Sequence, residues 1–115
     1  SGTLFTAQKA GNMDEIDRIT RLLYKNADER AASISSLNPA WNEEEWRSRL
    51  YRHIRYTIAG SSSLLAGDYA RNLDIFRSLM NLADSASGYF AKGLLQYLFT
   101  AGKMNTRQPE SLVSS

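Results

Sequence analysis

Proline is almost absent from this 115-residue chain, and that scarcity strongly limits what the chain can fold into. The two prolines are Pro39 and Pro109. Elsewhere apolar residues recur at the three- and four-residue spacing of amphipathic helices, while the alternating runs typical of strands are scarce. The sequence therefore predicts an all-α fold, built as a compact bundle or a short array of five to six antiparallel helices.

Local signals divide the chain into these helices. Asn12 can cap a helix that follows Gly11, and a helix must end before Pro39, because the residue preceding proline is pushed out of the helical region. Gly60 with the next three serines, and later Ser87-Gly88, interrupt the apolar period. The predicted helices cover residues 4–10, 13–25, 27–37, 42–59, 63 or 68 to 86, and 89–101.

The last predicted helix is the most apolar segment, and we expect it to form the centre of the core. Leu94 in this helix and Phe76 in the preceding one should then be buried. The preceding helix carries apolar residues around about half its circumference, which is typical of a helix packed on two sides. We assign residues 1–102 to one helical domain ending near Gly102, and residues 103–115 to a flexible polar tail.

Composition excludes several classes of protein. Without cysteine the chain has neither disulfides nor cysteine-ligated metals, and a cytoplasmic location is compatible with this. A net charge of +2 is too small to imply nucleic acid or an anionic membrane as partner. No apolar run is long enough to cross a bilayer, so we expect no membrane insertion. Ser1-Gly2 resembles the remnant of a removed tag, which suggests a domain excised from a larger protein.

The segment WNEEEWRSRLYRHIRY, from residue 41, concentrates charged and aromatic side chains. Its glutamates lie near the start of the predicted helix and its arginines farther along, as the helix dipole favours. Glu43 precedes Arg47 by four residues, and Glu45 precedes Arg49 by four, which is the favourable order for ion pairs within a helix. The charge pattern is thus explained by helix stability alone.

A second interpretation is a partner-binding face. Arg49, Arg52 and Tyr56 fall on one strip of the predicted helix, with His53 beside it, opposite the apolar arc. Arginine and tyrosine are enriched where proteins bind other proteins, so these four residues are the candidate site for a protein partner of unknown identity. The alternative is a nucleic-acid-binding helix, because the same residue types contact phosphates and stack on bases.

Arg47 stands apart because it falls inside the apolar arc. Either its aliphatic stem packs while the guanidinium reaches solvent, or the guanidinium pairs with a buried carboxylate.

The sequence offers no constellation for catalysis. His53 is the only histidine, and general acid–base chemistry normally needs an orienting partner. The glycines form no phosphate-binding loop, and Gly93 is better explained by a close helix contact. We therefore expect neither an enzyme nor a bound cofactor or metal, but a non-catalytic interaction or regulatory domain.

Short similarities leave further alternatives open. Trp41 and Glu45 form a W-x-x-x-E pattern that resembles the signature of bacterial guanine-exchange-factor effectors, although the rest of that family's pattern is not recognisable. This resemblance implies a second alternative, a fragment of a bacterial effector or enzyme. Residues 4–28 are similar to one ankyrin repeat, which supports paired antiparallel helices. Helical positions also match at an offset of 60 residues, and whether this reflects a true repeat stays open.

Overall fold

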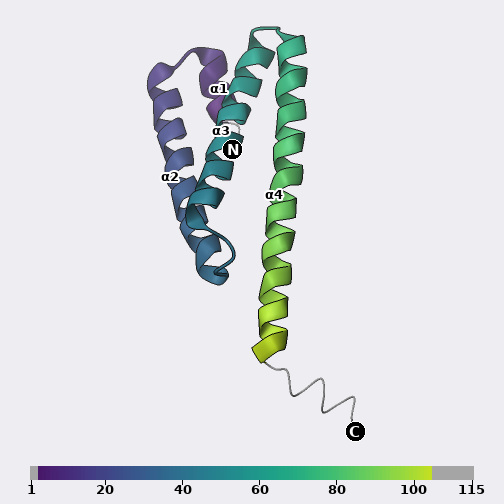
Figure 1. The fold of residues 1–115 in the computed structure, drawn as a ribbon. Coiled ribbons are helices and arrows are strands. Elements are labelled where there is room, and N and C mark those ends of the chain that lie inside the picture. Colours follow the sequence, from purple (N-terminus) through teal and green to yellow (C-terminus); the bar gives the residue numbers. More distant parts are fainter. Residues whose placement is uncertain (1–2, 105–115) are drawn as a thin grey trace.

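The computed structural model describes residues 3–104, and no strand occurs among them. The all-α prediction is confirmed, but four helices replace the five to six that we expected (Figure 1). They are α1 (Thr3–Ala10), α2 (Met13–Leu37), α3 (Glu43–Leu65) and α4 (Tyr69–Met104).

The helix starts follow the capping signals of the sequence. The Asn12 side chain accepts a hydrogen bond from the Glu15 amide at 3.2 Å, and Asn42 accepts one from Glu45 at 3.0 Å. Both satisfy amides that lack a partner in the first turn of a helix. Gly11 and Gly67 occupy the left-handed region, with φ of +69° and +74°, which explains glycine at these two turns.

Three predicted breaks are wrong, because the helices continue through them. α2 joins the second and third predicted helices, α3 runs through Gly60, and α4 runs through Ser87-Gly88. A serine hydroxyl in α3 can donate a hydrogen bond to a carbonyl of the preceding turn, and Ser63 donates in this way to the Gly60 carbonyl at 2.8 Å. α4 also continues past Gly102 to Met104, so the predicted tail begins inside a helix and its residues 105–115 lie outside the described residues.

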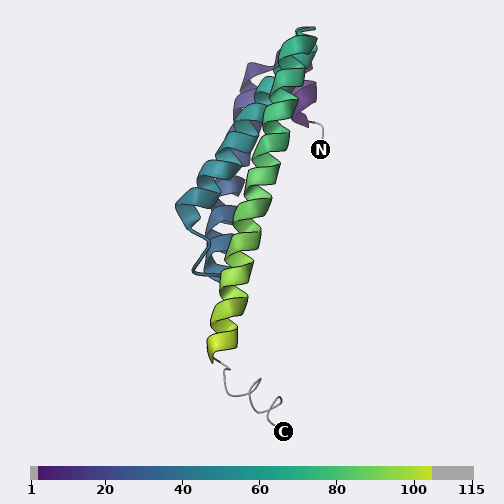
Figure 2. The same ribbon diagram turned by 45° about the vertical axis from the view of Figure 1, so that its right-hand side comes forward.

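The three long helices form a single layer in which α3 lies between α2 and α4 (Figure 1). The short α1 packs on α2 and α3 at one end of the layer. The described chain measures 69 × 28 × 21 Å with a radius of gyration of 20.1 Å, whereas a compact domain of this length has about 13 Å. The fold is therefore an elongated array, and Figure 2 shows α4 running past the ends of α2 and α3.

Trp41, in the loop between α2 and α3, joins the two outer helices. Its indole packs in a core cluster with Ala31 of α2 and Trp46 of α3, and it stacks on Phe90 of α4 with ring centroids 4.8 Å apart. The indole also lies directly against Gly93, where a Cβ would overlap it. The close contact expected at Gly93 is thus made with a tryptophan side chain.

Hydrogen bonds fasten the same loop to α4. The buried Asn38 side chain donates to the Gly93 carbonyl at 2.8 Å. The Tyr89 hydroxyl accepts from the Asn42 amide at 2.9 Å and donates to the Ala40 carbonyl at 3.3 Å. The loop therefore needs both the shape and the polar groups of this turn of α4.

The predicted core was misplaced. Leu94 and Phe76 are 40% and 57% exposed, and the buried apolar residues lie mainly where α2, α3 and the Trp41 loop meet. The physical reason is that α4 packs on α3 alone, which covers only one side of its wide apolar surface. The end of α4 that we expected at the centre of the core projects beyond α3 (Figure 1).

We predict that Gly93→Ala lowers the free energy of unfolding by about 1–3 kcal/mol, because the new methyl group must displace the Trp41 indole. Gly88→Ala is the matched control in the same helix, since a Cβ there meets nothing within 4 Å. It should raise stability by about 0.5–1 kcal/mol through helix propensity. Urea denaturation measures both, and equal stabilisation by the two variants would contradict the proposed role of Gly93.

Candidate functional site

The predicted partner-binding strip on α3 is divided by the fold, and Arg49 lies within the α3–α4 interface. Its side chain is only 15% exposed and pairs with Glu45 at 2.9 Å. It donates to the Ser85 hydroxyl at 2.8 Å, and its guanidinium carbon lies 5.0 Å from the centre of the Tyr89 ring. Arg49 therefore links α3 to α4, and the exposed position that we expected for it is wrong.

The other three predicted residues lie closer to solvent. Arg52 is exposed and Tyr56 is half-buried, and both line a shallow hollow of about 200 Å³ between α3 and α4. Ser78 and Ser85 of α4 form its opposite wall. His53 is exposed and does not line this hollow. The structure thus brings Arg52 and Tyr56 together, while partner binding by the four residues stays a prediction.

Arg47 joins α3 to α2 through a carboxylate cluster. Its Nε lies 2.9 Å from Asp28 of α2, one Nη lies 2.6 Å from Glu43, and the other pairs with Glu44. The hydrogen bond that Arg47 donates to Glu44 leads the effects that raise the pKa of Arg47. The side chain is 24% exposed, and its partners Asp28, Glu43 and Glu44 are 47%, 45% and 80% exposed. The guanidinium therefore reaches the surface and is paired there, and pairing with a buried carboxylate is wrong.

One apolar face of α4, which we call the open seam, has no helix of the described chain packed on it, although its Phe90 stacks on Trp41 of the loop. Its large side chains are each 40–69% exposed, and small residues Ala83 and Ser87 separate the two halves of the row. The large residues are Tyr69, Leu73, Phe76, Met80, Phe90, Leu94 and Tyr97. No helix of the described chain packs on this face, since α4 contacts α3 alone and does so through a different face.

α1 borders the open seam at one end. Phe5 of α1 and Leu64 of α3 line a groove of about 230 Å³ together with Phe76 and Leu79 of α4. Phe5 and Leu64 are themselves 39% and 45% exposed. The seam is therefore flanked by further apolar surface where α3 ends and α4 begins.

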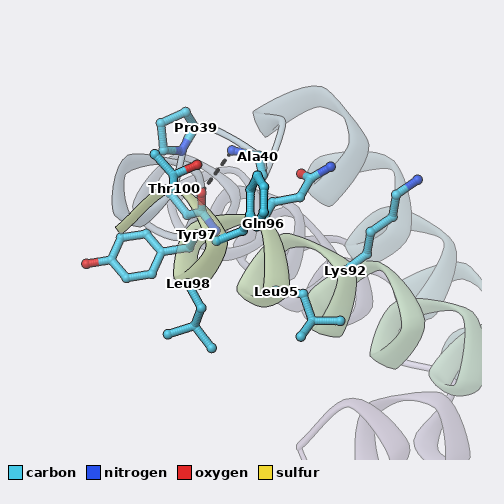
Figure 3. Close-up of a pocket in the computed structure, with 10 residues that line it drawn as sticks. Pro39, Ala40, Lys92, Leu95, Gln96, Tyr97, Leu98 and Thr100 are labelled. Carbon is cyan, nitrogen blue, oxygen red and sulfur yellow. Dashed lines mark hydrogen bonds between the residues drawn. The ribbon is translucent and has the colours of Figure 1, made fainter. Parts of the chain in front are cut away.

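A broad concavity of about 1190 Å³ lies near the other end of α4 (Figure 3). Pro39 and Ala40 form one side, and the turns of α4 from Lys92 to Thr100 form the other. Most of its lining is apolar, from residues such as Leu95 and Leu98, and the described residues that line it include no histidine or carboxylate. These described residues offer contact surface and one cationic side chain, Lys92, without an evident acid–base pair.

Sequence reasoning missed the open seam, although a signal was present. The spacing of its residues alternates between four and three positions from Tyr69 to Tyr97, and it continues through Ser87. The break predicted at Ser87-Gly88 divides this one seam into two shorter patterns. The apolar surface of this helix is as wide as packing on two sides would need. Only one of its two sides, however, has a partner helix within the described chain.

Within residues 3–104, no three histidine, aspartate or glutamate side chains are placed to hold a metal ion. Among the same residues, no helix has the length and apolar character required to span a bilayer. No known family model, curated protein or solved structure matches this chain.

We predict different costs for truncating the two central arginines. Arg49→Ala should lower the free energy of unfolding by about 1–3 kcal/mol, because it removes charged hydrogen bonds from the α3–α4 interface. Arg52→Ala is the control on the same helix and should stay within about 0.5 kcal/mol, since Arg52 is exposed. Thermal and urea denaturation measure both, and equal effects would show that Arg49 does not join the helices.

We predict that Tyr51→Phe destabilises the fold in a pH-dependent way. The Tyr51 hydroxyl donates to Asp28 at 2.6 Å, and this hydrogen bond to a carboxylate raises the pKa of Tyr51. The stabilisation is present below the unfolded pKa of about 10 and is lost as pH rises through the higher folded value. Denaturation of both proteins should show a stability gap at neutral pH that closes in alkali, and a gap independent of pH would contradict this assignment.

Proposed function

We propose that this chain is a non-catalytic protein–protein interaction module, and that it binds through the open seam of α4. The observation that carries the proposal is the row of large apolar side chains along this helix, each at least 40% exposed. Soluble proteins seldom leave a continuous patch of this kind uncovered unless it contacts a partner. A helical partner fits best, because the residues repeat at helical spacing along one straight face.

Two of the four α3 arginines are engaged within the domain, which weakens support for the nucleic-acid alternative. Arg47 is surrounded by three carboxylates, and Arg49 pairs with Glu45 under Tyr89. A protein that grips phosphates needs cations free to neutralise them. Half of the arginine charge of this helix is therefore used to join α2, α3 and α4.

The W-x-x-x-E pattern also has a structural explanation. Trp41 is 7% exposed and packs in the core, and Glu45 pairs with Arg49. Both residues thus contribute to packing of the helices, so the pattern gives no independent support for the effector alternative.

We predict that Phe76→Glu abolishes partner retention while leaving the fold intact. Phe76 is 57% exposed, so a charge there should disturb an apolar interface far more than the monomer. Asn81→Glu adds the same charge to the polar side of α4 and is the matched control. Immobilised protein is exposed to native cell extract, retained proteins are identified (this chain included), and each is titrated by calorimetry.

Affinity should fall at least about tenfold for Phe76→Glu, equivalent to about 1.4 kcal/mol, and should be unchanged for Asn81→Glu. Circular dichroism confirms that both variants remain helical. Equal retention by the two folded variants would show that the open seam is not the binding surface.

A further inference from the structure

α4 carries two parallel seams with the same spacing. The first faces α3, and all of its members are buried or half-buried: Asn72, Ile75, Leu79, Leu82, Ala86, Tyr89 and Gly93. The second is the open seam, in which Ala83 and Ser87 continue the alternation of four and three residues. This is the heptad repeat by which helices form coiled coils. One seam is used within the chain, and the other has the same spacing but no helix of the described chain packed on it.

We propose that the helix which covers the open seam is α4 of a second copy of this chain, packed antiparallel. This inference rests on the proposed function and names its partner. In a two-fold dimer each residue of the seam meets a different residue of the other copy, and each contact occurs twice. The predicted layers pair Met80 with Ala83, Phe76 with Ser87, Leu73 with Phe90, and Tyr69 with Leu94.

Side-chain size supports this arrangement. The two small members of the seam, Ala83 and Ser87, lie opposite the large Met80 and Phe76, so no layer pairs two small side chains, and the outer layers, such as Leu73 with Phe90, pair two large ones. Interdigitation of this kind fills a core without voids. A parallel in-register dimer would instead place Phe76 against Phe76 and Ser87 against Ser87. The layer of two large side chains would then be wider than the layer of two small ones.

Charge selects the same register. Arg77 and Asp84 flank the open seam on the side away from α3, and both are exposed. In the proposed register Arg77 of each copy lies beside Asp84 of the other, which gives two opposite-charge pairs of the kind that set partner orientation in coiled coils. A shift of one heptad in one direction would bring Arg77 beside Arg77, and a shift in the other would bring Asp84 beside Asp84.

The same register covers apolar surface outside the seam. The end of α4 projects beyond α3 (Figure 2), and antiparallel packing carries this end along the start of α4 in the other copy. Leu98 then lies near the connection between α3 and α4 of the second chain, where Leu64 and Leu65 are 45% and 38% exposed. The layers from residue 69 to residue 94 alone extend about 39 Å along the helix.

Sedimentation analysis of the whole chain, with charge-reversed variants, tests the dimer. The unaltered chain should sediment at twice the 12.9 kDa mass of one copy. Arg77→Glu alone and Asp84→Lys alone each create like-charge pairs and should weaken dimerisation about tenfold. The combined variant Arg77→Glu/Asp84→Lys restores opposite charges and should return to within about threefold of the original affinity. A combined variant weaker than either single change would overturn the register.

Cysteine cross-linking tests orientation directly, because the chain contains no cysteine of its own. Phe76→Cys/Ser87→Cys should form covalent dimers on mild oxidation, since antiparallel packing brings the two positions together. Met80→Cys/Ala83→Cys is a second pair from the neighbouring layer. Ser87→Cys alone should remain uncross-linked. Covalent dimers of Ser87→Cys alone would show a parallel arrangement and overturn the proposal.

The failure of this inference is separable from failure of the proposed function. A chain that sediments as a monomer at all concentrations overturns the second copy as partner. The proposed function survives that result if Phe76→Glu still loses affinity for a different protein. Both are overturned if the chain is monomeric and Phe76→Glu binds every retained protein as tightly as Asn81→Glu does.

Discussion

The contact between the Trp41 indole and Gly93 is the interaction on which the arrangement of this chain depends. α2 and α4 do not pack on each other, and among the long helices each meets only the central α3. Trp41 fills the space between them, against Ala31 on one side and Gly93 with Phe90 on the other. A single aromatic side chain from a loop thus fixes how three long helices lie in one layer, and Asn38 and Tyr89 hold that loop in place.

The layered arrangement explains why so much apolar surface remains exposed. In a layer three helices wide, an outer helix has one neighbour, whereas a helix in a closed bundle has two. α4 is an outer helix with apolar residues on two adjacent faces, so one face stays open. Complete burial of one leucine or phenylalanine contributes about 1.5–3 kcal/mol. Covering a seam of seven large side chains in a dimer would therefore offset the entropy of association.

The sequence was informative about local structure and much less so about packing. The all-α class, the cap at Asn12 and the stop before Pro39 follow from chemistry within a few residues. The sequence predicts breaks at Gly60 and Ser87-Gly88, but a glycine costs a helix only about 1 kcal/mol. Packing between α3 and α4 overcomes that cost, as where the Asn72 side chain of α4 donates to the Gly60 carbonyl of α3.

The helical wheel could not place the core or the site for a related reason. It shows which face of a helix is apolar, but not whether another helix of the same chain covers that face. Phe76 and Leu94 were therefore expected inside, and Arg49 outside, although Arg49 meets Ser85 and Tyr89, both at least 36 residues farther along the chain. Contacts between residues this far apart in the chain depend on the order of the helices in the layer. Trp41, which lies in a loop, determines that order.

Hydrogen–deuterium exchange along α4 tests the central claim, that the open seam is covered by a second copy, most directly. The end of α4 projects beyond α3 (Figure 1), and amides near the end of a helix open readily. Exchange should therefore slow across residues 94–102 as protein concentration rises, while amides of α2 near Ala27 and Ala31 change little. Exchange at residues 94–102 that does not vary with protein concentration would contradict the account.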